Sequence, residues 1–142
     1  MIAIDTNLLV YAHRAATRQH KAARKAIQKA ASSSGGWGIA LPCLAEFWSV
    51  VTHPTCSGGP STVNQARNFL ENLLRSGSGQ IWLPSADLAE QLMEVAEEMK
   101  IQGTRIFDLQ IAVIASGNGA TEIWTHDADF LSVSGLKVYD PL

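Results

Sequence analysis

Met1-Ile2-Ala3-Ile4-Asp5-Thr6-Asn7 is the stretch that decides the fold. Its first four residues form a short apolar run that is typical of a buried strand, and an acid and two polar residues follow at once. Comparable runs predict further strands at residues 37–41, 81–83 and 122–125, and residues 137–139 predict a short fifth strand. The first strand therefore has several candidate neighbours in a sheet.

Helical periodicity fills the intervals between these runs. The pattern begins at about Leu8, resumes at residues 22–30, and continues at residues 42–53, 62–74, 85–100 and 107–115. Strands that alternate with helices predict a parallel sheet with right-handed crossovers. We expect an α/β fold that forms one domain over residues 1–142. Its three α/β/α layers consist of a central, mostly parallel sheet of four to five strands and helices on both faces of the sheet.

The composition limits the class of protein. The 142 residues are 46% hydrophobic and 17% charged, which is typical of an ordinary folded domain. The formal net charge of −2 argues against a protein that binds nucleic acid through its overall charge. The longest apolar run, residues 111–115, is too short to span a bilayer. The first residues do not resemble a signal peptide, and two cysteines without a CxxC motif favour a reduced, cytoplasmic protein.

The charges are unevenly distributed along the chain. No acid occurs between Asp5 and Glu46, whereas this interval contains six cations: Arg14, Arg18, Lys21, Arg24, Lys25 and Lys29. A run of this kind is usually a solvated helix face, and a surface that meets phosphates is the alternative. The sequence leaves both interpretations open.

Four acids occupy related positions in the expected fold. Asp5 and Asp127 follow the carboxyl ends of strands, and Glu46 and Asp108 lie near the starts of helices that return from that edge. Because parallel strands end at the same edge of a sheet, we expect the four carboxylates to converge where such folds bind ligands. An acid near a helix start often only stabilises the helix dipole, but the joint pattern favours a site.

Clustered carboxylates raise one another's pKa unless a cation neutralises them. No Lys or Arg adjoins Asp5, Glu46 or Asp127 in the sequence. A hard cation with oxygen ligands, Mg²⁺ or Mn²⁺, is the natural counter-charge, and such an ion can activate water for attack on a phosphodiester. The acids therefore predict metal-dependent hydrolysis.

The ordered set of motifs resembles the PIN domain, and more narrowly the VapC-type toxins of bacterial toxin–antitoxin pairs. The resemblance rests on Ile4-Asp5-Thr6-Asn7, on Glu46-Phe47-Trp48 with Val51-Thr52-His53-Pro54, on Asp108 at the start of an apolar helix, on Thr125-His126-Asp127-Ala128-Asp129-Phe130, and on Tyr139-Asp140-Pro141-Leu142. It covers essentially the whole chain. One departure is Leu109-Gln110 after Asp108, where the family commonly has Ala.

The resemblance implies a Mg²⁺- or Mn²⁺-dependent endoribonuclease, usually a homodimer, that a VapB-like antitoxin holds inactive. Asp5 and Asp108 would be the principal metal ligands, and Glu46 and Asp127 would complete the catalytic acidic cluster. Asp129 is a weaker candidate metal ligand, and Thr6, Asn7 and Thr125 would orient the carboxylates or simply end the strands. Arg105 would contact a substrate phosphate or pair with an acid, and Arg14 is a further candidate contact to the substrate.

Two other functions stay open at this point. In a phosphatase of the haloacid-dehalogenase type, Asp5 would be a covalent nucleophile, although such enzymes have Asp where this chain has Asn7. In a catalytically silent RNA-binding module the fold would remain without cleavage. We expect such a module to have lost some of the four acids, which this chain retains.

Overall fold

A single five-stranded sheet runs through the molecule, and a computed structural model describes the backbone of residues 1–142 and every side chain except that of Ser76. The strands are β1 (Ile2–Ile4), β2 (Trp37–Ala40), β3 (Gln80–Trp82), β4 (Glu122–Trp124) and β5 (Lys137–Tyr139). They lie in the order β3-β2-β1-β4-β5, and every neighbouring pair is parallel. The N-terminal strand is therefore the central one.

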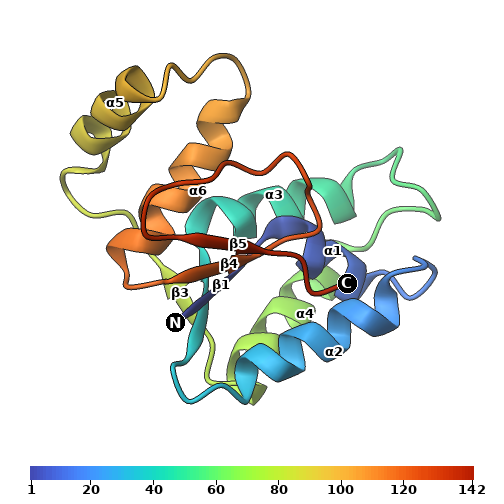
Figure 1. Cartoon of the computed structure of the whole chain (residues 1–142). Helices are drawn as coiled ribbons and strands as arrows, with labels where there is room; N and C mark the ends of the chain where they lie inside the picture. The colour runs from blue at the N-terminus through green and yellow to red at the C-terminus, as the bar shows by residue number, and fades with distance from the viewer.

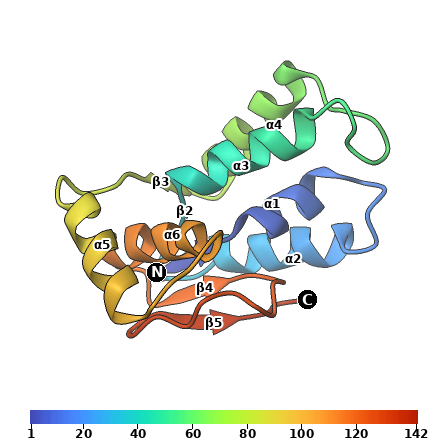
Figure 2. The same ribbon diagram turned by 90° about the horizontal axis from the view of Figure 1, so that it is seen from above.

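Six helices connect the strands: α1 (Thr6–His13), α2 (His20–Ala31), α3 (Leu41–Thr52), α4 (Val63–Ser76), α5 (Leu88–Glu98) and α6 (Arg105–Gly117). In Figure 1, α3, α5 and α6 lie above the sheet, and α2 and α4 lie below it. The view turned by 90° shows α1 and α2 side by side (Figure 2). The predicted three-layer α/β/α fold with a parallel sheet is confirmed.

Two helices begin earlier than predicted. Asp5 caps α1, because its side chain accepts a hydrogen bond from the Thr6 N–H, so α1 starts at Thr6 and not near Leu8. Leu41, predicted as the end of a strand, is instead the first residue of α3, whose first turn contains Pro42. Glu46 consequently lies in the second turn of α3 and not in the first.

Other boundaries differ by one to three residues. The edge strand β3 ends at Trp82, so Leu83 is outside it, and Thr125 follows β4. The helix predicted at residues 85–100 is shorter, Leu88–Glu98, and none of its described side chains is buried. It packs against α6, which is longer than predicted and buries Leu109, Ile111, Ala112, Ile114 and Ala115.

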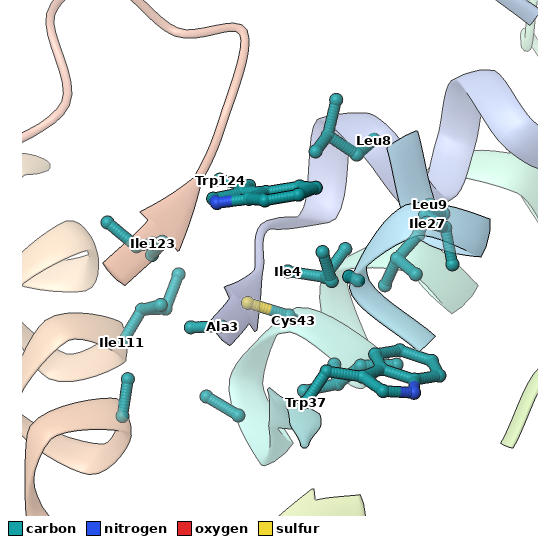
Figure 3. Close-up of a cluster of buried hydrophobic side chains, with 14 of the residues drawn as sticks. Ala3, Ile4, Leu8, Leu9, Ile27, Trp37, Cys43, Ile111, Ile123 and Trp124 are labelled. Carbon is teal, nitrogen blue, oxygen red and sulfur yellow. The ribbon is translucent and has the colours of Figure 1, made fainter. Parts of the chain in front are cut away.

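The hydrophobic core surrounds β1 and holds its carboxyl end in place. Figure 3 shows Ala3 and Ile4 of β1 among side chains from α1, α2, β2, α3, α6 and β4. Trp37, Phe47 and Ile123 are each at most 1% exposed. None of the helices in the described chain combines the length and the apolar character that crossing a lipid bilayer requires.

The close approach of β2 to Trp82 yields a prediction about stability. A Cβ added at Gly38 would overlap the indole ring of Trp82, which is 2% exposed. We expect Gly38→Ala to lower the free energy of unfolding by about 1–3 kcal/mol in urea denaturation, as overpacked core variants do. The control is Gly117→Ala, where an added Cβ meets nothing within 4 Å. Equal stability of both variants would contradict the packing argument.

Candidate active site

The structure brings the four predicted acids to the carboxyl edge of the sheet. Asp5 directly follows β1, and its N–H donates to the carbonyl of Trp124, the last residue of the neighbouring strand β4. Asp127 comes three residues after that strand end. Glu46 in α3 and Asp108 in the first turn of α6 complete the set. Residues far apart in sequence thus meet because their strands are adjacent and parallel.

Three N–H and O–H donors fix the carboxylate of Asp5, which is only 6% exposed. Its Oδ1 accepts from the Thr6 N–H at 2.7 Å. Its Oδ2 accepts from the Thr125 hydroxyl at 2.6 Å and from Asn7 Nδ2 at 2.7 Å. All three donors are neutral, so they orient the carboxylate without cancelling its charge.

Thr6 also places a second carboxylate beside the first. Its hydroxyl donates to Glu46 Oε2 at 2.6 Å, while its backbone N–H is bound to Asp5. One residue therefore holds an acid from α3 next to the acid that ends β1. Through these two bonds Thr6 would orient both carboxylates, which is the role predicted for it.

Asn7 and Thr125 anchor the loop that carries Asp127. The side-chain carbonyl of Asn7 accepts from the His126 N–H at 3.0 Å, and the Thr125 hydroxyl accepts from the Asp127 N–H at 3.0 Å. The Asp129 N–H in turn donates to Asp127 Oδ1 at 2.9 Å. In this structure Asp129 therefore orients Asp127 through its backbone, while its own side chain is exposed.

Electrostatic coupling links the four acids. Burial raises the pKa of Asp5, hydrogen bonds from Thr125 and Thr6 oppose this rise, and the charges of Glu46 and Asp127 add to it. The pKa of Asp108 is also raised, first by burial and then by the charges of Asp5, Asp127 and Glu46. The neighbouring carboxylates thus make the ionisation of Asp5 and of Asp108 less favourable, as expected for a cluster that lacks a counter-charge.

The two predicted phosphate contacts differ in position. Arg105 lies in the first turn of α6, where its charge opposes part of the rise in the pKa of Asp108. Its Nη2 is 3.5 Å from the carbonyl oxygen of Asp129. Arg14 lies at the far end of α1, about 12 Å from its start. Its guanidinium donates to the carbonyls of Ser57 and Gly59, so it holds a loop and does not contact the acids.

Sequence reasoning missed two neighbours of the site. The Cys43 thiol is fully buried with its Sγ 3.9 Å from Asp5 Oδ1, and burial together with the charge of Asp5 raises its pKa. His126 is 2.9 Å from Asp140 through Nδ1 and Oδ2, and its ring meets that of Tyr11 edge-on at 6.1 Å. These contacts join residues 38, 14 and 115 positions apart, so no local spacing could have indicated them.

The donor set fits a hard divalent cation. Within the described side chains, no three His, Cys, Asp or Glu groups already converge as a metal-binding group. Mg²⁺, however, usually keeps several water ligands and needs only one or two protein carboxylates. Asp5 satisfies the chemical condition: it is a buried carboxylate, and the ion pairs formed by the described side chains, Arg67–Glu71 and His126–Asp140, do not involve it.

The chain is similar to solved toxin structures. It matches VapC20 of Mycobacterium tuberculosis, described as a sarcin-ricin loop cleaving toxin, with a TM-score of 0.68 at 18% identity over 92% of each chain. It matches a chain of VapBC2 from Rickettsia felis, solved bound to a DNA fragment from its promoter, with a TM-score of 0.67 at 24% identity over 99% and 98% of the two chains. These likenesses support the fold.

Curated relatives match over nearly the whole chain as well. Ribonuclease VapC48 of Mycobacterium tuberculosis is 25% identical over 137 residues, which are 96% of this chain and 94% of the relative. VapC ribonuclease Mb2897 of Mycobacterium bovis is 28% identical over 142 residues, 100% of this chain and 96% of the relative. The PIN domain family model matches residues 2–136, and the chain therefore belongs to the PIN domain family.

Proposed function

We propose that this protein is a divalent-metal-dependent endoribonuclease and the toxin of a VapBC-like type II toxin–antitoxin pair. The observation that carries the proposal is the buried Asp5 carboxylate, held by three neutral donors at an edge where Glu46, Asp108 and Asp127 also lie. The curated relatives named ribonucleases support the same activity. The substrate is RNA, and the bond broken is a phosphodiester.

Mg²⁺ or Mn²⁺ would be held mainly by Asp5 and Asp108, with Glu46 and Asp127 completing the site and Asp129 as a weaker ligand. When bound, the ion supplies an activated water and stabilises the leaving oxygen. Thr6, Asn7 and Thr125 keep the carboxylates in position, because each donates a hydrogen bond to Asp5 and makes a second bond within the site. Oriented ligands of this kind support precise placement of a substrate phosphate.

The phosphatase alternative fits the geometry less well. A phosphatase of this type would need a second carboxylic acid at position 7, beside the nucleophilic Asp5. Position 7 is an Asn whose amide donates to Asp5, so it cannot act as an acid there. A silent binding module is also disfavoured, since the described site retains all four acids in mutual electrostatic contact.

The proposal includes a cytoplasmic location, a homodimer and a cognate antitoxin. Structural neighbours include a toxin–antitoxin complex from Klebsiella pneumoniae, with a TM-score of 0.63 at 20% identity. In this chain a groove of about 1080 Å³ lies between α1, α2 and α4, with Ile27, Trp37 and Phe69 among its apolar lining and Arg24 and Arg75 among its cations. Such a groove suits an amphipathic helix that carries acidic residues.

Removal of one charge from the acidic cluster tests the activity. We expect Asp108→Asn to reduce RNA cleavage in Mg²⁺ or Mn²⁺ at least about 100-fold, a loss of ~2.7 kcal/mol of transition-state stabilisation. The isosteric control is Glu97→Gln on the exposed α5, which should cleave like wild type. Cleavage of a labelled RNA is followed on gels, with EDTA as the metal-free arm. Wild-type rates for Asp108→Asn would exclude the proposed role.

The raised pKa of Asp108 also predicts a stability difference that depends on pH. The folded state favours the protonated form of this carboxyl. Its contribution to the free energy of unfolding is therefore full below the ordinary pKa of 3.8 and is lost as the pH rises through the raised pKa. At pH 7 without metal, Asp108→Asn should be more stable than wild type. The gain is up to about 1 kcal/mol, because water screens this partly exposed group.

Urea unfolding in EDTA at several pH values measures this difference, which should shrink as the pH falls toward 3.8. The Glu97→Gln variant again serves as the control and should show no such trend. If Asp108→Asn were less stable than wild type at pH 7, the charge of Asp108 would stabilise the metal-free fold, and the prediction would be wrong.

Light scattering tests the proposed assemblies. The chain has a mass of 15.3 kDa, so a homodimer should scatter as about twice that value. Co-expression with the product of the adjacent gene should give a larger complex and relieve any growth arrest. A monomer with no interacting neighbour would remove the partner part of the proposal and leave the nuclease part intact.

A further inference from the structure

Four exposed cations lie on the outer face of α2 and in the turn before it. Lys21, Lys25 and Lys29 follow one another at intervals of four residues, so they line one side of the helix, and Arg18 lies in the turn that precedes it. We call this row the α2 cationic stripe. The opposite side of α2 is buried in the core through Ala23, Ala26, Ile27 and Ala30. The stripe is therefore a fixed surface on a packed helix.

These charges work against the stability of the helix that bears them. Lys21, Lys25 and Lys29 are like charges four residues apart, which repel each other. Lys21 lies in the first turn, where the helix dipole disfavours a cation, and that turn contains no acid. The ion pairs of the described side chains, Arg67–Glu71 and His126–Asp140, leave the stripe without an anionic partner. Charges that reduce the stability of their own helix are typical of a surface that binds a ligand.

The stripe begins on the same side of the molecule as the acidic cluster. His20, the first residue of α2, is 3.0 Å from the Tyr11 carbonyl oxygen through Nδ1. The Tyr11 ring contacts His126, the neighbour of Asp127. From Lys21 to Lys29 the stripe extends about 12 Å along the helix, and Arg18 precedes this part. A strand whose scissile phosphate lies at the acids can thus continue along α2.

We propose that the α2 cationic stripe binds backbone phosphates of the RNA substrate away from the scissile bond. This inference rests on the proposed ribonuclease function. A chain of net charge −2 with clustered carboxylates at its candidate site has little general attraction for RNA, and a group of unpaired cations can supply it. A row of point charges on a helix suits repeated phosphates and reads no base sequence.

The surroundings of the stripe favour RNA over other anionic surfaces. Insertion into a membrane surface requires a free apolar helix face, and the apolar face of α2 is occupied by the core. Docking of a protein requires apolar anchors, whereas the exposed residues of α2 besides its cations are Ala22 and Gln28. The stripe supplies charge alone, as nonspecific binding of a nucleic-acid backbone requires.

The test is the triple variant Arg18→Gln, Lys21→Gln and Lys25→Gln. Lys29 is left in place because its Nζ lies 5.7 Å from the ring centroid of Trp124. Binding of a fluorescent 24-nucleotide single-stranded RNA is measured at several KCl concentrations with the metal chelated. Each lost phosphate contact reduces the slope of log affinity against log salt by about 0.7, so we expect a decrease of about 2.

The matched control removes three cations elsewhere: Arg67→Gln, Lys100→Gln and Lys137→Gln. These residues are exposed and lie outside α2, so this variant should keep the wild-type slope. With metal, the stripe variant should have a higher KM for the 24-nucleotide RNA and an unchanged kcat. It should cleave a pentanucleotide centred on the same bond as wild type does, because that substrate is too short to reach the stripe.

An unchanged salt slope and an unchanged KM in the stripe variant would overturn the proposal. Weaker binding of the antitoxin with unchanged RNA binding would overturn it in favour of a protein partner. The thermal midpoint should rise when the repulsion is removed, and a lower midpoint with an unchanged slope would assign the stripe a structural role. If wild type cleaves no RNA, the proposed function fails, and the salt slope still judges the stripe by itself.

Discussion

The need to hold one buried negative charge organises this molecule. Asp5 ends the central strand, starts α1 as its cap, and receives hydrogen bonds from Thr6, Asn7 and Thr125. A buried carboxylate without donors would cost several kcal/mol, so these bonds are a condition of folding. They also join β1 to the end of β4 and to the Asp127 loop. Fold and candidate chemistry therefore depend on the same few atoms.

Charge of both signs is concentrated on this side of the molecule. The pKa values of Asp5 and Asp108 are raised by burial and by the neighbouring carboxylates, and the like charges of the α2 cationic stripe repel one another along the helix. Neither arrangement favours stability, and the core around Trp37, Phe47 and Ile123 supplies the compensating burial. The acids suit a bound cation and the stripe suits a bound polyanion, so a metal and an RNA would each relieve one of the two conflicts.

Much of this could be predicted from periodicity and from the order of the acids. Apolar runs located β1 to β4, because buried parallel strands have short, nearly continuous apolar sequences, whereas the edge strand β5 has exposed residues at both ends. The start of α1 could not be predicted in the same way, because it depends on the capping bond from the Thr6 N–H to Asp5, which hydrophobic periodicity does not indicate. The contacts of Cys43 with Asp5 and of His126 with Asp140 depend on the sheet order, which no local pattern contains. The hydrogen bonds from Arg14 to the loop carbonyls could not be predicted from local sequence either, because these partners lie more than 40 residues away.

The strand order also governs when the site can come into being. β1 is synthesised first but occupies the middle of the sheet, and its neighbour β4 begins 120 residues later. A nascent chain that has reached only α6 lacks Thr125 and Asp127, so it cannot hold Asp5 as the finished protein does. The acidic pocket can therefore form only after β4 and the loop that follows it have been synthesised. Until then the chain holds Asp5 without the hydroxyl and the loop that fix its carboxylate in the finished fold.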